Sequence, residues 1–224
     1  MKVAPAGGMS ITGGEFKTAI EKLIQDYSIH NVIETGTYKG TGSTRIIAEA
    51  LNKKGIEYNL FTMEANPEFA NEAVDNLRPF PYVNVINGYS LPKYLLPTKE
   101  YVKNMLTELD KEDIYVDFQD HERLELYGSD NRYEVTYDNL QMVLRFFGWR
   151  ADLIVLDSSG AMGWIEFQYV MQLLKGEAII VLDDTNHVKH FKSLQHIKKN
   201  PKFQMIFESQ EKFGFCIAKY RGGN

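Results

Sequence analysis

The stretch NVIETGTYKGTGSTRIIAEAL, residues 31–51, predicts a buried strand, a glycine-rich turn and an amphipathic helix in succession. The apolar start of this stretch ends in the acid Glu34, and the helix opens at Ser43. Three glycines lie between them: Gly36, Gly40 and Gly42. A turn without Cβ atoms lets a ligand approach the backbone N–H groups at the helix N-terminus, where the helix dipole is positive. On this stretch alone, an ordinary strand-to-helix turn is the alternative.

The spacing of the glycines and the position of the acid indicate the kind of ligand. The pattern is G-x-x-x-G-x-G, which differs from the G-x-G-x-x-G turn that holds a pyrophosphate in dinucleotide enzymes. An acid two residues before Gly36 favours a cationic ligand over an anionic one. S-adenosylmethionine carries an amino group and a sulfonium, so the turn favours this nucleoside as the ligand.

A second strand and helix repeat the arrangement. Residues 58–63 read as a strand that is followed by the acid Glu64, and residues 66–77 read as a helix with Asn66 as N-cap and Pro67 in its first turn. An acid at this point can accept hydrogen bonds from both ribose hydroxyls of a nucleoside. The alternative is a carboxylate that stabilises the N-terminus of the following helix.

Composition places the chain among globular proteins and argues against several classes. It has 224 residues, of which 44% are hydrophobic and 25% are charged, with Cys216 as the single cysteine. No apolar run approaches the roughly 20 residues that span a bilayer. Residues 1–14 lack the apolar core of a signal peptide, so we expect a flexible arm or cofactor lid and a cytoplasmic protein without a membrane partner. A net charge of −5 gives no support to nucleic acid binding.

The remaining sequence alternates strands with helices. We expect a helix over 14–29, strands at 83–88, 152–157 and 178–183, helices at 164–175 and 188–199, and a strand hairpin at 203–220. The predicted fold is therefore α/β: a doubly wound, Rossmann-like sheet of mostly parallel strands with a C-terminal antiparallel hairpin and helices on both faces. Residues 15–224 form a single domain in this prediction.

One long excursion, about residues 91–137, departs from the alternation. It is long for a connection in an α/β domain, and the region that contains it is acidic. Its aromatic residues favour an ordered element that covers the acceptor site or forms a subunit contact in a homodimer.

From Asn31 to Tyr220 the chain resembles the class I S-adenosylmethionine-dependent methyltransferases. The family signature E/D-x-G-x-x-x-G-x-S/T falls on Glu34, Gly36 and Gly40, with a slight offset at Gly42 and Ser43. The family's reversed final hairpin matches residues 203–220. The resemblance implies that Glu34, Gly36 and Tyr38 line the methionine end of the cofactor, that Glu64 holds the ribose, and that Tyr89 and Ser90 flank the adenine. The full implied cofactor set is Glu34, Gly36, Thr37, Tyr38, Gly40, Gly42, Ser43, Glu64, Ala65, Gly88, Tyr89, Ser90 and Asp157.

Three acids follow the last two parallel strands and are candidates for chemistry. Asp157 ends one strand, and Asp183 and Asp184 end the next. Carboxyl ends of adjacent parallel strands converge on one crevice, where three carboxylates repel one another unless a cation or a proton intervenes. Oxygen ligands suit Mg²⁺. The layout is similar to the metal-dependent sugar O-methyltransferases of the macrocin type, which implies a sugar or glycosylated natural product as the acceptor. It also loosely resembles catechol O-methyltransferase, but Gly160 stands where that family has its catalytic lysine.

Methyl transfer requires alignment of the reactants and, for an oxygen acceptor, removal of a hydroxyl proton. We expect O-methylation, with magnesium assisting or with Asp157, His187 or Lys189 as the catalytic groups. Three alternatives stay open for the acids: Asp157 touches only the cofactor, Asp184 caps the last helix, or the Lys189 ammonium neutralises them without a metal. A nicotinamide-dependent oxidoreductase and a non-catalytic protein with the same fold are the rival functions.

Overall fold

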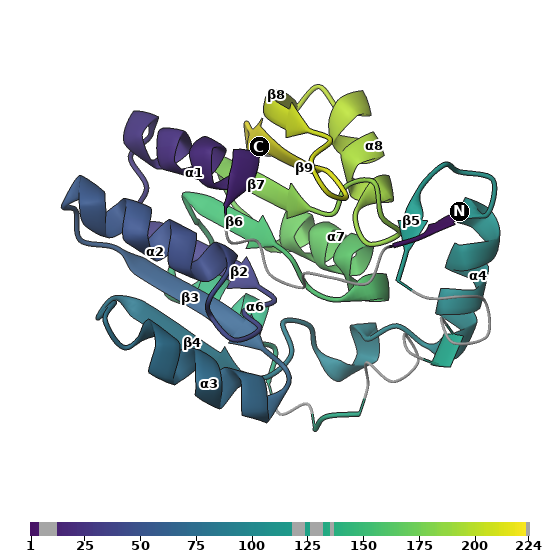
Figure 1. Cartoon of the computed structure of the whole chain (residues 1–224), viewed down its shortest axis with the longest axis horizontal. Coiled ribbons are helices and arrows are strands. Elements are labelled where there is room, and N and C mark those ends of the chain that lie inside the picture. Colours follow the sequence, from purple (N-terminus) through teal and green to yellow (C-terminus); the bar gives the residue numbers. More distant parts are fainter. Residues whose placement is uncertain (5–12, 118–123, 126–131, 135–136, 223–224) are drawn as a thin grey trace.

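Seven strands form one mixed sheet in the order β4-β3-β2-β6-β7-β9-β8 (Figure 1). The computed structural model describes residues 1–4, 13–117, 124–125, 132–134 and 137–222. The strands of the sheet are β2 (Asn31–Thr35), β3 (Asn59–Glu64), β4 (Val83–Asn87), β6 (Leu153–Leu156), β7 (Ala178–Asp183), β8 (Phe203–Ser209) and β9 (Phe215–Tyr220).

The strand directions confirm the predicted fold. Strands β4, β3, β2, β6 and β7 pair in parallel, and β9 enters antiparallel between β7 and β8. In the central strand, Val32 lies opposite Leu60 on one side and Leu153 on the other. The parallel strands therefore all end at the same edge of the sheet, where the predicted acids lie.

Helices cover both faces of the sheet, and alternate residues of each strand pack against one face or the other. On one face lie α1 (Gly14–Asp26), α2 (Ser43–Lys54) and α3 (Pro67–Leu77), and on the other lie α6 (Asn139–Phe146), α7 (Gly163–Leu173) and α8 (Phe191–Lys199). In β2, for example, Val32 packs in the core beneath α1 and α2, and Ile33 packs in the core on the opposite face, beneath α6, α7 and α8. Within the described residues, no helix combines the length and the apolar character needed to cross a bilayer.

Helix α3 begins at its predicted cap, whereas α8 begins later than predicted. The Asn66 side chain accepts a hydrogen bond from the Glu68 N–H at the start of α3. Helix α8 begins at Phe191, three residues later than predicted, and its N-cap is His190. The alternative in which Asp184 caps this helix is therefore wrong. Residues 186–188 cannot be helical, because they pair through backbone hydrogen bonds with Tyr115.

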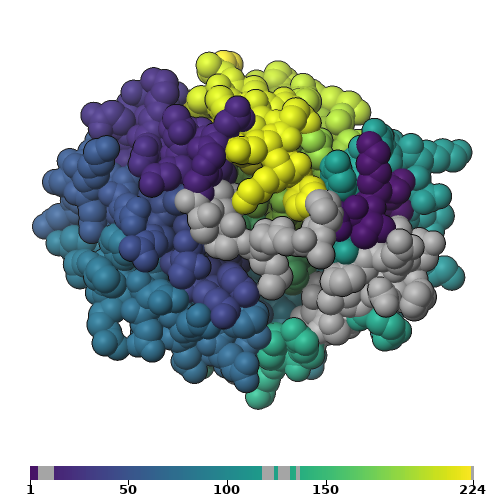
Figure 2. All heavy atoms as spheres, in the orientation of Figure 1, coloured from purple at the N-terminus to yellow at the C-terminus, as the bar shows by residue number. Residues whose placement is uncertain are grey.

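The predicted excursion contains regular elements, one of which pairs with the N-terminal strand in a separate two-stranded sheet. It includes the 3-10 turn η1 (Lys93–Leu95), helix α4 (Lys99–Leu109) and the short strand β5 (Tyr115–Val116). Strand β5 pairs in parallel with β1 (Lys2–Val3). In Figure 2 the first residues lie beside the insertion, separated from α1 by the C-terminal strands. Residues 5–12 of the predicted arm, and 118–123, 126–131 and 135–136 of the excursion, lie outside the described residues.

Candidate active site at the carboxyl ends of the strands

The predicted site residues gather at one edge of the sheet because four parallel strands end there. Glu34 lies in β2, Glu64 ends β3, Asp157 follows β6, and Asp183 ends β7. In an open parallel sheet this edge is where ligands bind.

The turn after β2 needs glycine at its first position. Gly36 has a φ of +85°, and a Cβ atom there would lie 2.2 Å from the backbone carbonyl oxygen of Asp157. Any larger residue would push the turn away from the loop after β6. The glycine therefore brings the two loops into contact at the predicted cofactor position. The turn then continues through Gly40 and Gly42 into α2, whose first residue, Ser43, is buried.

Glu34 lies beneath this turn and is fully buried. Its Oε2 atom accepts hydrogen bonds from the hydroxyls of Thr44 in α2 and Thr62 in β3. Its Oε1 atom accepts no well-aligned hydrogen bond from the described residues. Burial raises the pKa of Glu34 to about 7, although the threonine hydroxyls oppose the shift. An incompletely paired acid at this position fits a cationic group above it.

Glu64 is already oriented by the backbone. Its Oε2 atom accepts from the Tyr38 N–H at 2.7 Å, and its Oε1 atom accepts from the Asn66 N–H at 2.8 Å. Burial raises the pKa of Glu64, and these backbone donors partly offset the shift. Each carboxylate oxygen has a further lone pair, so a pair of vicinal hydroxyls can donate to it. The donor set therefore fits the ribose of a nucleoside.

The other predicted cofactor residues flank Glu64. Tyr38 has a φ of +51°, and its ring packs edge-on against Phe69 at 4.6 Å between centroids. Thr37 shares a hydrogen bond with Thr62, and the Gly88 N–H donates to the Glu64 carbonyl. Tyr89 and Ser90 are buried, while Ala65 is partly buried in the same cluster as Tyr89. The structure thus brings the predicted methionine, ribose and adenine positions together around the ends of β2, β3 and β4.

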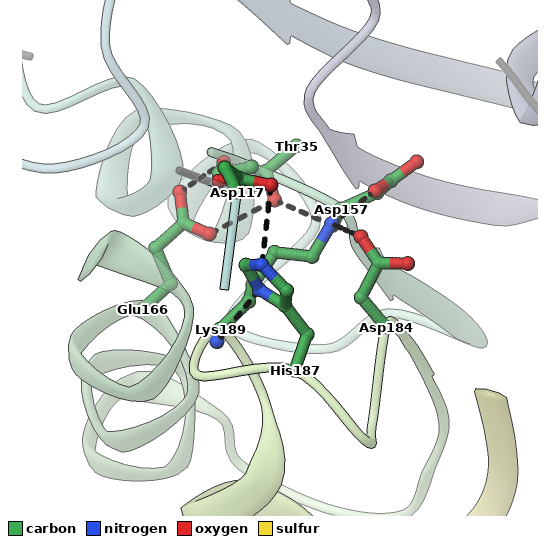
Figure 3. A network of polar contacts seen from close by, with 8 residues as sticks. Thr35, Asp117, Asp157, Glu166, Asp184, His187 and Lys189 are labelled. Atoms are coloured by element: carbon green, nitrogen blue, oxygen red, sulfur yellow. Dashed lines mark hydrogen bonds and ion pairs between the residues drawn. The ribbon is translucent and has the colours of Figure 1, made fainter. Parts of the chain in front are cut away.

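The three acids after β6 and β7 lie together. Figure 3 shows the side chain of Lys189 between two of them, Asp157 and Asp184. One oxygen from each of Asp157, Asp183 and Asp184 lies within 4.8 Å of the others. The Lys189 Nζ atom lies 2.6 Å from Asp157 Oδ1 and 2.7 Å from Asp184 Oδ2. The oxygen donors suit Mg²⁺, but an ammonium already lies between two of them.

Burial and the mutual interaction of these charged groups shift the pKa values of Asp183 and Lys189. Burial and the neighbouring Asp157 and Asp184 carboxylates raise the pKa of Asp183 well above its ordinary value, and Asp183 shares a hydrogen bond with Asp157. Desolvation lowers the pKa of Lys189, but the attraction of Asp157 and Asp184 outweighs it and leaves the pKa well above its ordinary value. These surroundings therefore favour the protonated form of Asp183 and the charged form of Lys189.

His187 is held on the side of the cluster that faces the insertion. Its ring is 4% exposed, and its Nδ1 atom accepts a 3.3 Å hydrogen bond from the Lys189 backbone N–H. Its Nε2 atom lies 3.1 Å from Asp117 Oδ1, which is within ion-pair distance but is not aligned as a hydrogen bond. Both ring nitrogens therefore face protein groups, an arrangement that favours a positioning role over proton transfer.

Sequence reasoning missed Glu166, a fully buried acid in α7. Its carboxylate accepts hydrogen bonds from Thr35 at the end of β2, from Ser158 after Asp157, and from Ser90, a residue of the predicted adenine position. It therefore joins three of the segments that form the site, and its contact with Thr35 is visible in Figure 3. A single acid in the otherwise uncharged run GWIEFQYVMQL was the available signal.

Comparison with solved structures supports the fold assignment. The O-methyltransferase from Bacillus cereus in complex with S-adenosylhomocysteine superposes with a TM-score of 0.58 at 16% identity, covering 97% of this chain and 84% of that one. The O-methyltransferase TomG from Streptomyces achromogenes, involved in tomaymycin synthesis and bound to S-adenosylmethionine, has a TM-score of 0.58 at 15% identity, covering 96% and 82%.

A methyltransferase from Geobacter sulfurreducens has a TM-score of 0.55 at 11% identity, covering 94% of this chain and 80% of that one. No family model matches the sequence, and a comparison with curated proteins finds no significant relative. At these identities the likeness establishes the fold alone, which this chain shares with these methyltransferase structures.

Proposed function

We propose that this chain transfers a methyl group from S-adenosylmethionine to a hydroxyl oxygen of a small molecule. The observation that carries the proposal is the geometry of Glu64. Its two oxygens are fixed by backbone N–H groups beside the Gly36 turn, where they can accept the hydroxyls of a ribose. The solved structures of the same fold that contain S-adenosylmethionine or S-adenosylhomocysteine support the same ligand.

The bound cofactor would supply an activated methyl group on its sulfonium. Glu34, Gly36, Thr37 and Tyr38 would hold its methionine end, Glu64 its ribose, and Tyr89 and Ser90 its adenine. The protein must then align the acceptor and accept its proton. The backbone carbonyl of Asp157 lies beside the Gly36 turn, and its carboxylate contacts Lys189 Nζ at 2.6 Å. We assign this carboxylate as the proton acceptor. The Lys189 ammonium would stabilise the developing negative charge on the acceptor oxygen.

Magnesium assistance is a more specific prediction than methyl transfer itself, and it depends on Asp157, Asp183 and Asp184. A bound ion would lower the pKa of an acceptor hydroxyl. The donor atoms fit Mg²⁺, but its place between Asp157 and Asp184 is held by Lys189, so no step is assigned to a metal.

The chemical class of the methyl acceptor is also a more specific prediction than methyl transfer itself. The layout of acids after β6 and β7 favours a sugar or a glycosylated natural product, by its similarity to the macrocin-type enzymes. A homodimer is a separate prediction, which the mass of the protein in solution tests directly.

A Glu64→Ala variant tests the proposed function. Loss of charge-assisted hydrogen bonds to the ribose should weaken S-adenosylhomocysteine binding by about tenfold or more in calorimetry. The exposed Glu68→Ala variant, in the following helix, is the matched control and should bind as the wild type does.

Thermal shift with NADPH in place of S-adenosylhomocysteine separates the oxidoreductase alternative. Stabilisation by NADPH alone would contradict the proposal. Binding of S-adenosylhomocysteine without turnover on any hydroxylated acceptor would instead favour the non-catalytic alternative.

A further inference from the structure

The acid cluster after β6 and β7 contains a cation supplied by the chain itself. The Lys189 Nζ atom contacts oxygens of Asp157 and Asp184 at 2.6 and 2.7 Å, and its side chain is 6% exposed (Figure 3). A surface lysine that pairs with an acid keeps most of its side chain in water. The contact at Lys189 is therefore part of the folded interior.

The backbone around Lys189 directs its side chain into the cluster. The flanking Val188 N–H donates to the Tyr115 carbonyl, and the Asn186 N–H donates to the Phe213 carbonyl. These bonds tie the loop after β7 to the insertion on one side and to the final hairpin on the other. The loop therefore cannot turn Lys189 outward without breaking its backbone pairing.

Gly163 at the start of α7 leaves space for this side chain. A Cβ atom at Gly163 would lie 2.7 Å from Lys189 Cγ and 2.6 Å from the Lys189 carbonyl oxygen. Helix α7 and the loop are thus in contact only because residue 163 has no side chain. The absence of a side chain at Gly163 therefore leaves room for Lys189 between α7 and the loop.

The backbone conformation of Asp184 is a further feature of its contact with Lys189. Asp184 has a φ of +54°, a left-handed conformation that is uncommon for residues other than glycine but is adopted by aspartate more often than by most. Strain of this kind persists where the surrounding structure determines it, and it concentrates at functional sites. Here the residue with the uncommon conformation is one of the two acids that bind the ammonium.

We propose that Lys189 is the resident cation of this cluster and replaces the divalent metal that three converging acids would otherwise bind. The role of Lys189 in catalysis rests on the proposed function, whereas its role as the cation does not. The inference predicts that the wild-type protein has no site for a divalent ion at these acids. It also predicts that removal of the ammonium creates such a site.

The test is a titration of the full chain with Mn²⁺, followed by calorimetry and by the electron paramagnetic resonance signal of the free ion. Wild-type protein should show no saturable binding at the acids. Lys189→Met keeps the length and apolar stem of the side chain without its charge, and it should gain saturable binding of a single Mn²⁺ that the wild type lacks. The double variant Lys189→Met with Asp184→Asn should lose this binding.

Two controls make the result specific. Lys198→Met removes a partly exposed lysine that pairs with Glu208 on the far side of α8, and it should leave Mn²⁺ binding as in the wild type. The melting temperature gives a second reading: Lys189→Met should melt lower than the wild type, and millimolar Mn²⁺ should raise its melting temperature but not that of Lys198→Met.

Two results would overturn the inference. The first is a wild-type protein that binds a single Mn²⁺ which Asp184→Asn removes. The second is a Lys189→Met variant, folded by circular dichroism, that gains no Mn²⁺ binding. If Lys189→Met does not fold, the wild-type titration alone decides. A wild-type protein without affinity for S-adenosylhomocysteine would contradict the proposed function and leave this result standing.

Discussion

Glu34 and Glu166 are buried acids whose hydrogen-bond donors are side-chain hydroxyl groups. Thr44 and Thr62 donate to Glu34, and Thr35, Ser90 and Ser158 donate to Glu166. Burial raises the pKa of each acid. The sequence predicted Glu34 from its place before a glycine turn, but it gave no spacing that would join Glu166 to residues 35, 90 and 158. Contacts between segments so far apart in the chain depend on the folded sheet.

Glu34 should make stability depend on pH near neutrality. Its pKa is raised from 4.5 to about 7, so the native state holds a proton that the unfolded state releases. The stabilisation is complete below the unfolded pKa and is lost as the pH rises through about 7. Relative to Glu34→Gln, the wild type should lose about 3 kcal/mol of unfolding free energy between pH 4.5 and pH 8.

Urea denaturation of both proteins across this range measures the difference. The exposed Glu57→Gln variant is the control and should follow the wild type at every pH. A constant gap between wild type and Glu34→Gln from pH 4.5 to pH 8 would show that Glu34 does not titrate in this range.

Glu166→Ala should destabilise the protein by about 3 kcal/mol, because three buried hydroxyls lose their acceptor. Glu166→Gln keeps an acceptor oxygen and should lose less. The exposed Glu177→Ala variant, which removes a surface ion pair with Lys219, should stay within about 0.5 kcal/mol of the wild type. Chemical denaturation provides the comparison, and equal losses for Glu166→Ala and Glu177→Ala would contradict the role of the network.

At the scale of elements, strands were predictable because their pattern is local. The runs that became β6 and β7 are continuously apolar, as parallel strands covered on both faces require. The start of α8 was not predictable in the same way. The chain at its expected start instead forms backbone hydrogen bonds with Tyr115, a residue of the insertion more than 70 positions earlier in the chain. Tertiary pairing here overrides the local helical pattern.

The insertion should stabilise the loop that carries Lys189. Val116 of β5 is fully buried in a cluster with Val102, Met105, Ala161 and Val188. Val116→Ala should lower the free energy of unfolding by about 2 kcal/mol through lost packing. It should also speed hydrogen exchange at the Val188 amide, which donates to the Tyr115 carbonyl.

Val74→Ala is the matched control for this prediction, since Val74 is 52% exposed in α3. Hydrogen exchange by mass spectrometry should show no change at residues 186–190 in that variant. Unchanged exchange at Val188 in the Val116→Ala variant would mean that the insertion does not restrain the loop.

At the scale of the whole molecule, the topology separates this chain from a plain dinucleotide-binding domain. Strand β9 lies antiparallel between β7 and β8, as the final hairpin of the sequence predicted. The convergence of Glu64, Asp157 and Asp183 also followed from the sequence, because parallel strands end at one edge. The position of the Lys189 ammonium did not follow from the sequence, because a long side chain can point in many directions. Only the packing of α7 against the loop that carries Lys189 selects one of them.

A fold shared with methyltransferases does not by itself establish an activity. The central claim is that the ends of β2 and β3 bind an S-adenosyl nucleoside, with Glu64 at its ribose. A crystal structure of the protein grown with S-adenosylhomocysteine tests this claim most directly. The account predicts density for the nucleoside with both ribose hydroxyls within hydrogen-bonding distance of Glu64 and the homocysteine end beside Gly36 and Tyr38. Density for the nucleoside at any other place, or its absence at saturating ligand, would contradict the account.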